Sequence, residues 1–463
     1  MTTSVIACRY VLGMEGGRQA VLQDHYVYLD GPRIEAVSRD APAAGTPVVR
    51  YEHGFLMPGF VNLHTHCIRG GLFRGIPDDT EMEPWVPKLV YNVLLPLTAI
   101  VAKELTAEEL RAVTALGMID LLKGGTTTVM DMWHHGQEVF FDVARDVGLR
   151  TVGAPFIMSS SNARIGPDGY PVWDFGNDGM AQLAKSVALF KARDEGSEGL
   201  AQVAIGPHAT DTCLPELLRE CRKAADELDC LLTTHFAQTP QELGLLRARY
   251  GMGASEYAGD TGLLGGRVVL AHAGCATDDD LRVLADTGTH VANCALSFAR
   301  EGGNFPYARF AQAGINTGIG TDSHSMDLIG ELRVTGLLSK LYFGKAHFGT
   351  AHQLLGAATL NGARALGRPD LGRIEAGARA DLLVFDLFKP HLQPVRDPVK
   401  NLVWKGHAGD LAFVMVQGRP VVQDGRLLSM DEAAVMRTAA GAAKKIWALA
   451  EARGILPGAP VLQ

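Results

Sequence analysis

No apolar run in this 463-residue chain reaches the length that spans a bilayer. The N-terminus also lacks a charged segment followed by an apolar core and a cleavage site. No cluster of lysines and arginines stands out against a formal net charge of -8, which argues against a nucleic-acid partner. We therefore expect a cytoplasmic protein that acts on a small molecule and binds neither membrane nor nucleic acid.

Several motifs of common enzyme and metal-site classes are missing as well. The seven cysteines are scattered and contain no C-x-x-C pair, so neither a disulfide framework nor a thiolate zinc site is indicated. The chain has no G-x-S-x-G elbow, phosphate-binding loop, H-E-x-x-H helix or G-x-G-x-x-G turn. It also lacks the H-x-E and P-C-x-x-C pair of the cytidine-deaminase type of zinc site.

What the chain does have is a regular alternation of short apolar runs and helical segments. A helix in "TAEELRAVTALGMIDLLKGG" is predicted by the capping-box spacing of Thr106 and Glu109 and by the glycines that end it. Eight runs are apolar enough to be parallel strands buried on both faces, which predicts an α/β fold with a TIM (β/α)8 barrel. They are "FVNLHTH" (60–66), "TTTVMDM" (126–132), "RTVGAPFIM" (150–158), "AQVAIGPH" (201–208), "CLLTTHF" (230–236), "RVVLAHA" (267–273), "HVANCAL" (290–296) and "NTGIGTD" (316–322).

The two ends of the chain have a different pattern, with the strand-like alternation of segments such as "DLLVFDL" and "FVMVQGRPVVQDG". We expect residues 1–57 and 372–431 to form one small β-sandwich domain from both chain ends. The barrel would then occupy residues 58–371. Residues 432–463 are expected to form an amphipathic C-terminal helix with a structural role.

Ionisable side chains gather at the ends of the predicted strands, where the active site of a TIM barrel lies. Five of them stand at the ends of four runs: His64, His66, His235, His272 and Asp322. Alternation along a strand sends residues i and i+2 to the same face, so the first two histidines can both point into the barrel mouth. Three imidazoles and a carboxylate satisfy a borderline metal such as zinc and leave a position for an activated water. The other histidines singled out are expected to be packed or solvated: His25, His53, His347, His352, His391 and His407.

These motifs resemble those of a known family. "PGFVNLHTH", "THFAQ", "LAHAG" and "GIGTDS" are similar to segments of the amidohydrolase superfamily, in its branch of metal-dependent deaminases and chlorohydrolases. "HTHCIRGGLFRGIPDD", "GGTTTVMDM", "GPHATDTCLPELL" and "LGRIEAGARADLLVFD" resemble deaminases of S-adenosylhomocysteine, methylthioadenosine and deoxyadenosine. The resemblance covers nearly the whole chain. It implies a homo-oligomeric hydrolase that uses one divalent metal ion. Zinc is the expected ion, and iron, manganese or cobalt could bind at the same site.

The resemblance also implies roles for the strand-end residues. His64, His66, His235 and Asp322 would hold the metal, Asp322 would take the proton of the attacking water, and His272 would hydrogen-bond that water or the reacting centre. The fourth strand has no lysine that could be carboxylated to bridge a second metal, so a single metal is expected.

The chain departs from the deaminase pattern at one chemically important position. Where those enzymes have a glutamate that protonates the ring nitrogen, this chain has Gln238, which can donate a hydrogen bond but cannot shuttle a proton. "NCALSF" also replaces their His-Cys-Pro-x-Ser-Asn segment. His324, beside Asp322, is the replacement acid that we propose from the sequence.

Five further residues are candidates for substrate contact. Arg74 and Asp79, together with Asp78, match a loop that closes over the substrate in the resembled deaminases, although a solvated turn is the alternative. Trp85 could stack on a flat ring or anchor the same loop. His208 matches a histidine that follows the fourth strand of those enzymes and is expected to line the pocket.

Three functions remain open at this point. The first is hydrolytic deamination of an amino-substituted N-heterocycle (a purine, pterin or triazine), with halide displacement from a triazine as a variant. The second is hydrolysis of an exocyclic amide, urea or carbamate, in which no ring nitrogen needs a proton and Gln238 could simply orient the substrate. The third is a binding protein that keeps the barrel without catalysis.

Overall fold

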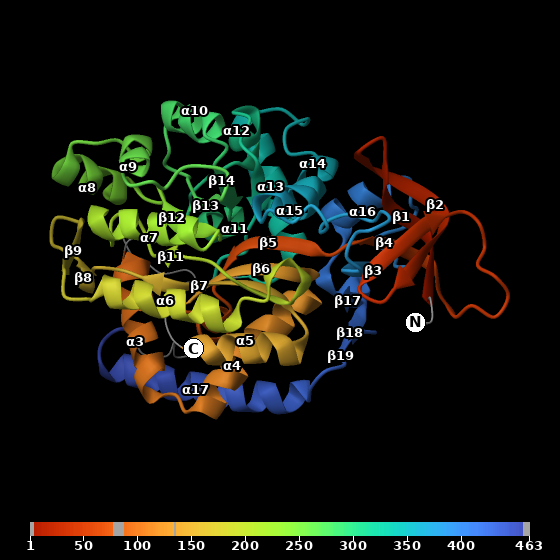
Figure 1. Ribbon diagram of the computed structural model, residues 1–463, viewed down its shortest axis with the longest axis horizontal. Coiled ribbons are helices and arrows are strands. Elements are labelled where there is room, and N and C mark those ends of the chain that lie inside the picture. The colour runs from red at the N-terminus through yellow and green to blue at the C-terminus, as the bar shows by residue number, and fades with distance from the viewer. Residues whose placement is uncertain (1–3, 77–87, 134–135, 324, 457–463) are drawn as a thin grey trace, which may run out of the picture.

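The computed structural model describes residues 4–76, 88–133, 136–323 and 325–456. A parallel sheet forms the barrel at the centre of the molecule, with the order β10-β7-β6-β5-β15-β14-β13-β12 and β11 paired to β7 (Figure 1). Its strands are β5 (Phe60–Thr65), β6 (Thr126–Trp133), β7 (Arg150–Ile157), β10 (Ala201–Val203), β11 (Gly206–Pro207), β12 (Leu232–Phe236), β13 (Val268–His272), β14 (His290–Asn293) and β15 (Thr317–Ile319). Each coincides with a predicted run, β6 extending one residue beyond its run, so the barrel prediction is confirmed.

The fourth strand of the barrel is divided into β10 and β11. The residues between these two strands make the contact with β12 that closes the barrel. The Ile205 N–H donates to the Leu231 carbonyl, because the chain turns from β7 toward β12 between β10 and β11. Bridges from Ile205 to Leu232 and from Ala209 to His235 continue this contact. The predicted run 201–208 therefore contributes two short strands.

Helices cover the outside of the barrel (Figure 1). Thr106 begins α4 with the predicted capping box, and Gly124 ends the helix. The helices of this layer are α1 (Cys67–Leu72), α3 (Leu95–Glu104), α4 (Ala107–Lys123), α5 (Gln137–Val147), α6 (Gly179–Arg193), α7 (Pro215–Glu227), α8 (Pro240–Tyr250), α9 (Ala254–Asp260), α10 (Asp278–Asp286), α11 (Ala295–Ala299), α12 (Tyr307–Gln312), α13 (Leu328–Phe343), α14 (Ala351–Gly356) and α15 (Gly362–Ala365). Short π-helical turns η1 (Leu89–Leu94) and η3 (Ala357–Asn361) precede α3 and α15, and the hairpin β8 (Ser161–Ile165) and β9 (Pro171–Asp174) precedes α6.

Both chain ends contribute to a second sheet, as predicted. Its eight strands have the order β19-β18-β17-β16-β4-β1-β2-β3, so that β16 from the C-terminal segment pairs with β4 from the N-terminal one. The strands are β1 (Ser4–Glu15), β2 (Arg18–Asp30), β3 (Arg33–Ser38), β4 (Val48–Pro58), β16 (Leu382–Asp386), β17 (Leu411–Val416), β18 (Arg419–Gln423) and β19 (Arg426–Leu427). Between β16 and β17 lie α16 (Pro398–Lys405) and the 3-10 turn η4 (Ala408–Asp410).

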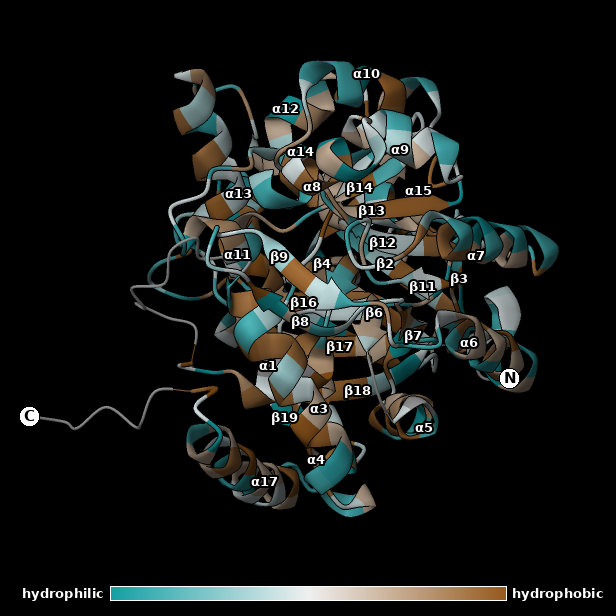
Figure 2. Cartoon of the chain, turned by 90° about the vertical axis from the view of Figure 1, so that its left-hand side faces the viewer, coloured by the Kyte–Doolittle hydropathy of each residue, from teal (hydrophilic) through white to brown (hydrophobic). Residues whose placement is uncertain are grey.

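The C-terminal helix α17 (Glu432–Ala452) runs beside α4 on the outside of the barrel (Figures 1 and 2). Its buried face consists of small and apolar side chains at helical spacing: Ala439, Ala442, Ala443, Ile446 and Ala450. This amphipathic pattern agrees with the predicted structural role. Among the described helices, none is both long and apolar enough to cross a membrane.

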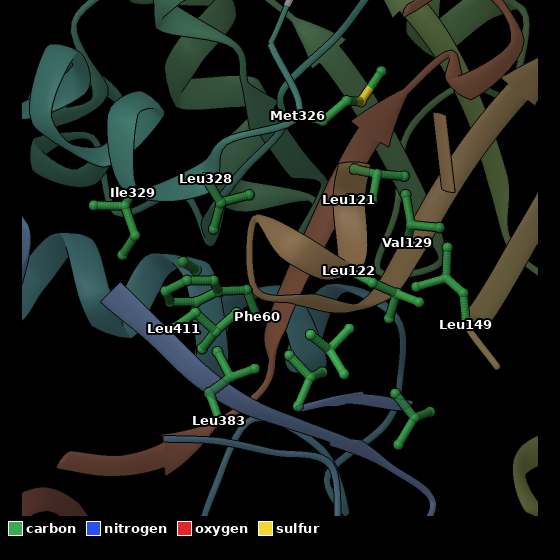
Figure 3. Packing of buried hydrophobic residues seen from close by; sticks show 14 of the residues in the cluster. Phe60, Leu121, Leu122, Val129, Leu149, Met326, Leu328, Ile329, Leu383 and Leu411 are labelled. Atoms are coloured by element: carbon green, nitrogen blue, oxygen red, sulfur yellow. The ribbon is translucent and has the colours of Figure 1, made fainter. Parts of the chain in front are cut away.

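An apolar cluster joins the barrel to the second sheet (Figure 3). Phe60 at the start of β5 packs with Leu122 of α4, Leu383 of β16 and Leu411 of β17, and all four side chains are buried. Burial of large apolar side chains supplies about 1.5–3 kcal/mol each, so this cluster fixes where the strands of the barrel begin.

A buried ion pair crosses the same junction. The guanidinium of Arg150, at the start of β7, donates to both carboxylate oxygens of Asp381, at 3.1 and 3.2 Å. Both side chains are almost fully buried, and Asp381 also accepts the Gln417 N–H at 2.6 Å. Because a buried charge needs its partner, this pair locks the sheet to the barrel.

We predict that Asp381→Ala lowers the free energy of unfolding by about 3–5 kcal/mol, because it leaves the Arg150 charge buried without its partner. Urea denaturation would measure the loss. The matched control is Asp146→Ala at the exposed pair with Arg111, where about 0–1 kcal/mol is expected. Equal losses in the two variants would contradict a special role for the buried pair.

Candidate metal centre

The first and last barrel strands meet at the residues predicted to bind metal. The Asp322 N–H donates to the His64 carbonyl at 2.9 Å, and the Thr65 hydroxyl donates to the Asp322 carbonyl at 2.8 Å. A side chain at Gly320 would meet the backbone oxygen of His64 at 2.9 Å, so only glycine lets the strands approach this closely. The closure of the barrel thus sets His64 beside Asp322.

Four histidines and one carboxylate converge at this mouth. Ligand atoms of His64, His66 and His235 lie within 4.8 Å of one another, as do those of His64, His272 and Asp322. The His66 Nε2 lies 3.4 Å from the His235 Nε2 and 3.6 Å from the Asp322 Oδ1. The structure therefore brings together all five strand-end residues that the sequence singled out.

Backbone carbonyls fix the orientation of two of the imidazoles. His66 Nδ1 contacts the Met132 carbonyl at 2.7 Å, and His235 Nδ1 contacts the His208 carbonyl at 2.5 Å. Because a carbonyl can only accept, each Nδ1 carries the proton and each Nε2 presents a lone pair to the centre. Burial, followed by the neighbouring imidazoles, lowers the pKa of His235 well below its usual value, which favours the neutral form that binds metals.

His272 and Asp322 hold unusual backbone conformations, with φ of 77° and 55°. Such conformations are uncommon outside glycine and cluster at functional sites. Burial lowers the pKa of His272, while the Asp322 charge acts in the opposite direction. The His272 Nδ1 is buried and has no hydrogen-bond partner among the described residues, so it can accept a bond from a bound molecule.

The donor set fits a single divalent metal. Zinc in tetrahedral coordination, with bonds of about 2.0–2.1 Å, separates its ligand atoms by about 3.3 Å. The measured separations of 3.4 and 3.6 Å around the His66 Nε2 are close to that value. Neutral imidazoles and a carboxylate are also the ligand types that such a metal accepts.

A pocket opens directly over these side chains. Gln238 and His208 line it, and His208 is fixed by a 2.8 Å hydrogen bond between its Nδ1 and the Thr212 hydroxyl. The lining residues are His66, Leu89, Val90, Leu94, His208, His235, Gln238, His272, Ser297, Phe298, Glu301, Asp322 and Ser323. A substrate that enters this pocket would therefore contact the metal ligands directly.

Of the remaining candidate residues, Arg74 is the one that belongs to the described part of the chain. Arg74 is not among the residues that line the pocket; its guanidinium donates to Asp120 of α4 at 2.7 Å. Its role in substrate binding stays a prediction. Asp79, Trp85 and His324 lie outside the described residues, as does Asp78. Asp131, at the end of β6, accepts the Cys67 N–H at 2.7 Å and so fixes the start of α1.

Sequence reasoning missed Glu301, which follows α11 and lines the pocket. Its Oε2 is buried without a hydrogen-bond partner among the described residues. Burial, and then the Asp322 charge, raise the pKa of this carboxyl to about 9. The signal that could have identified it is an acidic residue in the loop after the seventh predicted strand, at the same end of the barrel as the metal ligands.

Sequence reasoning also missed Glu242, which holds the backbone at Gln238, a residue that lines the pocket. Its carboxylate accepts the N–H groups of Ala237 and Gln238 at 2.9 and 2.8 Å, and the Thr210 hydroxyl also donates to it. These bonds hold the turn after β12 in place. Gln238 is consequently presented to the pocket by a rigid backbone.

The fold and the site together define a metal-dependent hydrolase of the TIM-barrel type. The family model of the amidohydrolase family matches residues 55–421, and the chain belongs to that family. The prediction of a metal-dependent enzyme that hydrolyses non-peptide C–N bonds is thereby confirmed.

Three individual proteins illustrate the relationship. The 5-methylthioadenosine/S-adenosylhomocysteine deaminase of Halobacterium salinarum is 32% identical over 452 residues, which cover 95% of this chain and 99% of the relative. The crystal structure of an adenosine deaminase from Xanthomonas campestris with bound zinc is similar with a TM-score of 0.84 and 28% identity, covering 96% and 98% of the two chains. An atrazine chlorohydrolase from Arthrobacter aurescens, complexed with zinc, shares the fold with a TM-score of 0.85 and 24% identity, covering 95% and 100%.

We predict that His66→Ala abolishes metal binding and lowers activity to background while the fold persists, since the barrel core does not depend on the ion. Metal content per chain and thermal unfolding would test both statements. The matched control is His290→Ala, a buried histidine at the other end of a barrel strand, which should keep metal and activity. Full activity in His66→Ala would refute the assignment of this side chain.

Proposed function

We propose that the chain hydrolytically deaminates an amino-substituted N-heterocycle, with an adenosine derivative as the preferred substrate class and zinc as the metal. The observation that carries the proposal is the convergence of four buried imidazoles and Asp322 beneath a pocket that also contains a carboxyl group and an amide. The relatives agree with it, because several of them are named as deaminases of adenosine compounds.

Each metal-site residue has a role in this proposal. His64, His66, His235 and Asp322 hold the ion. When bound, a divalent metal supplies Lewis acidity that activates water as a nucleophile near neutral pH.

Two side chains then act on protons. Asp322 takes the proton of the attacking water and passes it to the leaving ammonia, because a carboxylate at this position is within reach of both. His272 orients the water through its imidazole, which lines the pocket. Deamination of a ring carbon also needs a proton on the adjacent ring nitrogen, which Gln238 cannot deliver.

Glu301 is the side chain that we propose for this delivery. It lines the same pocket as Gln238, and a carboxyl group can both carry and release a proton, whereas an amide can only hydrogen-bond. Gln238 would orient the heterocycle while Glu301 protonates it. His324, which the sequence favoured for this step, stays a second candidate.

The other functions considered from the sequence have less support. None of the three relatives described above is an amide, urea or carbamate hydrolase. A binding protein without catalysis would not need all five residues of the metal centre. The homo-oligomeric state and the cytoplasmic location stay predictions.

The experiment that tests the function is a mass-spectrometric screen of zinc-loaded protein against pooled aminopurine nucleosides, aminopterins, triazines, arylureas and anilides. Exchange of an amino group for a hydroxyl in an adenosine derivative, absent in the His66→Ala variant, is the expected result. Cleavage of a urea or anilide into an amine and an acid fragment would overturn the proposal.

We predict that Glu301→Gln lowers kcat for deamination by about 10²–10⁴-fold, the usual contribution of a general acid. Metal content should be unchanged, because Glu301 is not a proposed ligand. Adding Gln238→Glu to this variant should restore part of the rate, since it places a carboxyl on the other side of the pocket.

The control for this pair is Glu451→Gln on the exposed surface of α17, which should not change kcat. His324→Gln tests the second candidate in the same assay. If Glu301→Gln keeps full activity while His324→Gln loses it, the proton comes from His324 and the role of Glu301 is refuted.

A further inference from the structure

A second group of metal-ligating side chains lies away from the barrel mouth. His391 is in the loop that follows β16, His407 directly precedes the turn η4, and Asp410 is the last residue of that turn, which leads into β17. One donor atom of each lies within 4.8 Å of the others. None of these elements contributes to the pocket over the catalytic histidines.

The three donor atoms form a nearly regular triangle. The His391 Nε2 lies 2.9 Å from the Asp410 Oδ2 and 3.3 Å from the His407 Nδ1, and the third side, from the His407 Nδ1 to the Asp410 Oδ2, is 3.6 Å. Ligand atoms of a tetrahedral zinc ion are separated by about 3.3 Å. One ion could therefore lie about 2.0–2.1 Å from all three atoms, within the ordinary range of zinc bonds.

A single hydrogen on the His391 Nε2 cannot serve both of its short contacts in this triangle. A ring nitrogen offers either one hydrogen or one lone pair. The His391 Nε2 can donate to Asp410, but it then has no second hydrogen for the His407 Nδ1 that faces it at 3.3 Å. A cation bound between the three atoms would accept one lone pair from each of them.

Neighbouring bonds hold the ligands in place. The Asp410 side chain is only 6% exposed, and its Oδ2 accepts the His407 N–H at 2.8 Å. Arg333 of α13 donates to the carbonyls of Val403 and Gly406, which fixes the chain just before His407. Such supporting bonds are typical of metal sites because they orient the ligands before the ion arrives.

The loop that carries His391 is fixed in a similar way. Asn401 of α16 donates to the Leu392 carbonyl at 2.6 Å, next to His391 in the chain. The His391 and His407 side chains are 37% and 61% exposed, so an ion can enter from solvent and keep a water ligand. Both segments are thus arranged for binding without a large rearrangement.

We propose that His391, His407 and Asp410 form a second site for a borderline divalent metal such as zinc, with water completing the coordination. The bound ion links the loop after β16 to the turn before β17. The turn η4 lies against α13, which also packs against α16, so the site stabilises this region and takes no part in catalysis.

The test is a count of bound metal in the full-length protein. The chain is stripped with a chelator and dialysed against micromolar free zinc, and the zinc per chain is measured. We expect two ions in the wild type, one in His407→Gln and one in His66→Ala. His407→Gln keeps the His391–Asp410 bond and the backbone N–H of residue 407, so the fold should persist.

Two further variants sharpen the result. His407→Cys supplies another zinc ligand and should restore the second ion. His352→Gln is the matched control and should keep two ions. The His352 Nε2 lies 3.6 Å from the Asp397 carboxylate, but among the described residues this pair belongs to no group of three metal-ligating side chains.

Zinc should also raise the midpoint of thermal unfolding of His66→Ala but not that of the double variant His66→Ala, His407→Gln. Equal zinc content in the wild type and His407→Gln would overturn the proposal, whatever the catalytic screen finds.

Discussion

The contact between the first and the last barrel strand is the constraint on which the site depends. His64 and His66 come from one end of the barrel sequence and Asp322 from the other, more than two hundred residues later. Their approach is enforced by backbone bonds between the strands and by the Asn62 amide, which donates to the Thr321 hydroxyl at 2.8 Å. Without this closure the carboxylate would not reach the histidines. The same closure requires glycine at position 320, so sequence, strand pairing and metal geometry are linked at a single place.

Strained backbone conformations also occur at the mouth of the barrel. Positive φ values occur at Ala237, directly after β12, at His272, the last residue of β13, and at Asp322, three residues after β15. Such conformations cost about 1–3 kcal/mol each and persist only where surrounding bonds impose them. Here the Ala237 N–H is held by Glu242, and the Asp322 N–H by the His64 carbonyl. These backbone conformations, which direct the side chains of the site inward, therefore lower the stability of the fold. The buried contacts between the barrel and the second sheet offset this cost.

The sequence predicted the barrel and the convergence of the metal-site residues, because parallel strands buried on both faces give continuous apolar runs and because their polar ends share one face of the barrel. It did not reveal Glu301, since the loop after β14 has no periodicity from which a side-chain direction could be inferred. The pairing of Arg74 with Asp120 was not predicted either, because the position of Asp120 on α4 depends on tertiary packing, and the substrate role suggested by the motif match stays a prediction. The triangle of His391, His407 and Asp410 joins two loops, and no local pattern predicts how loops meet.

The position that departs from the resembled deaminases is also one that the backbone holds firmly. Both the Ala237 and the Gln238 N–H donate to Glu242, so the turn does not rely on the Gln238 side chain for its shape. Exchange of a glutamate for a glutamine there changes the chemistry at the tip of the side chain and leaves the pocket wall in place. A carboxyl group elsewhere in the same pocket can then take over the proton, because a general acid needs reach and a labile proton rather than one particular strand. The pocket thus allows the reaction to be kept while the acid moves from one wall to another.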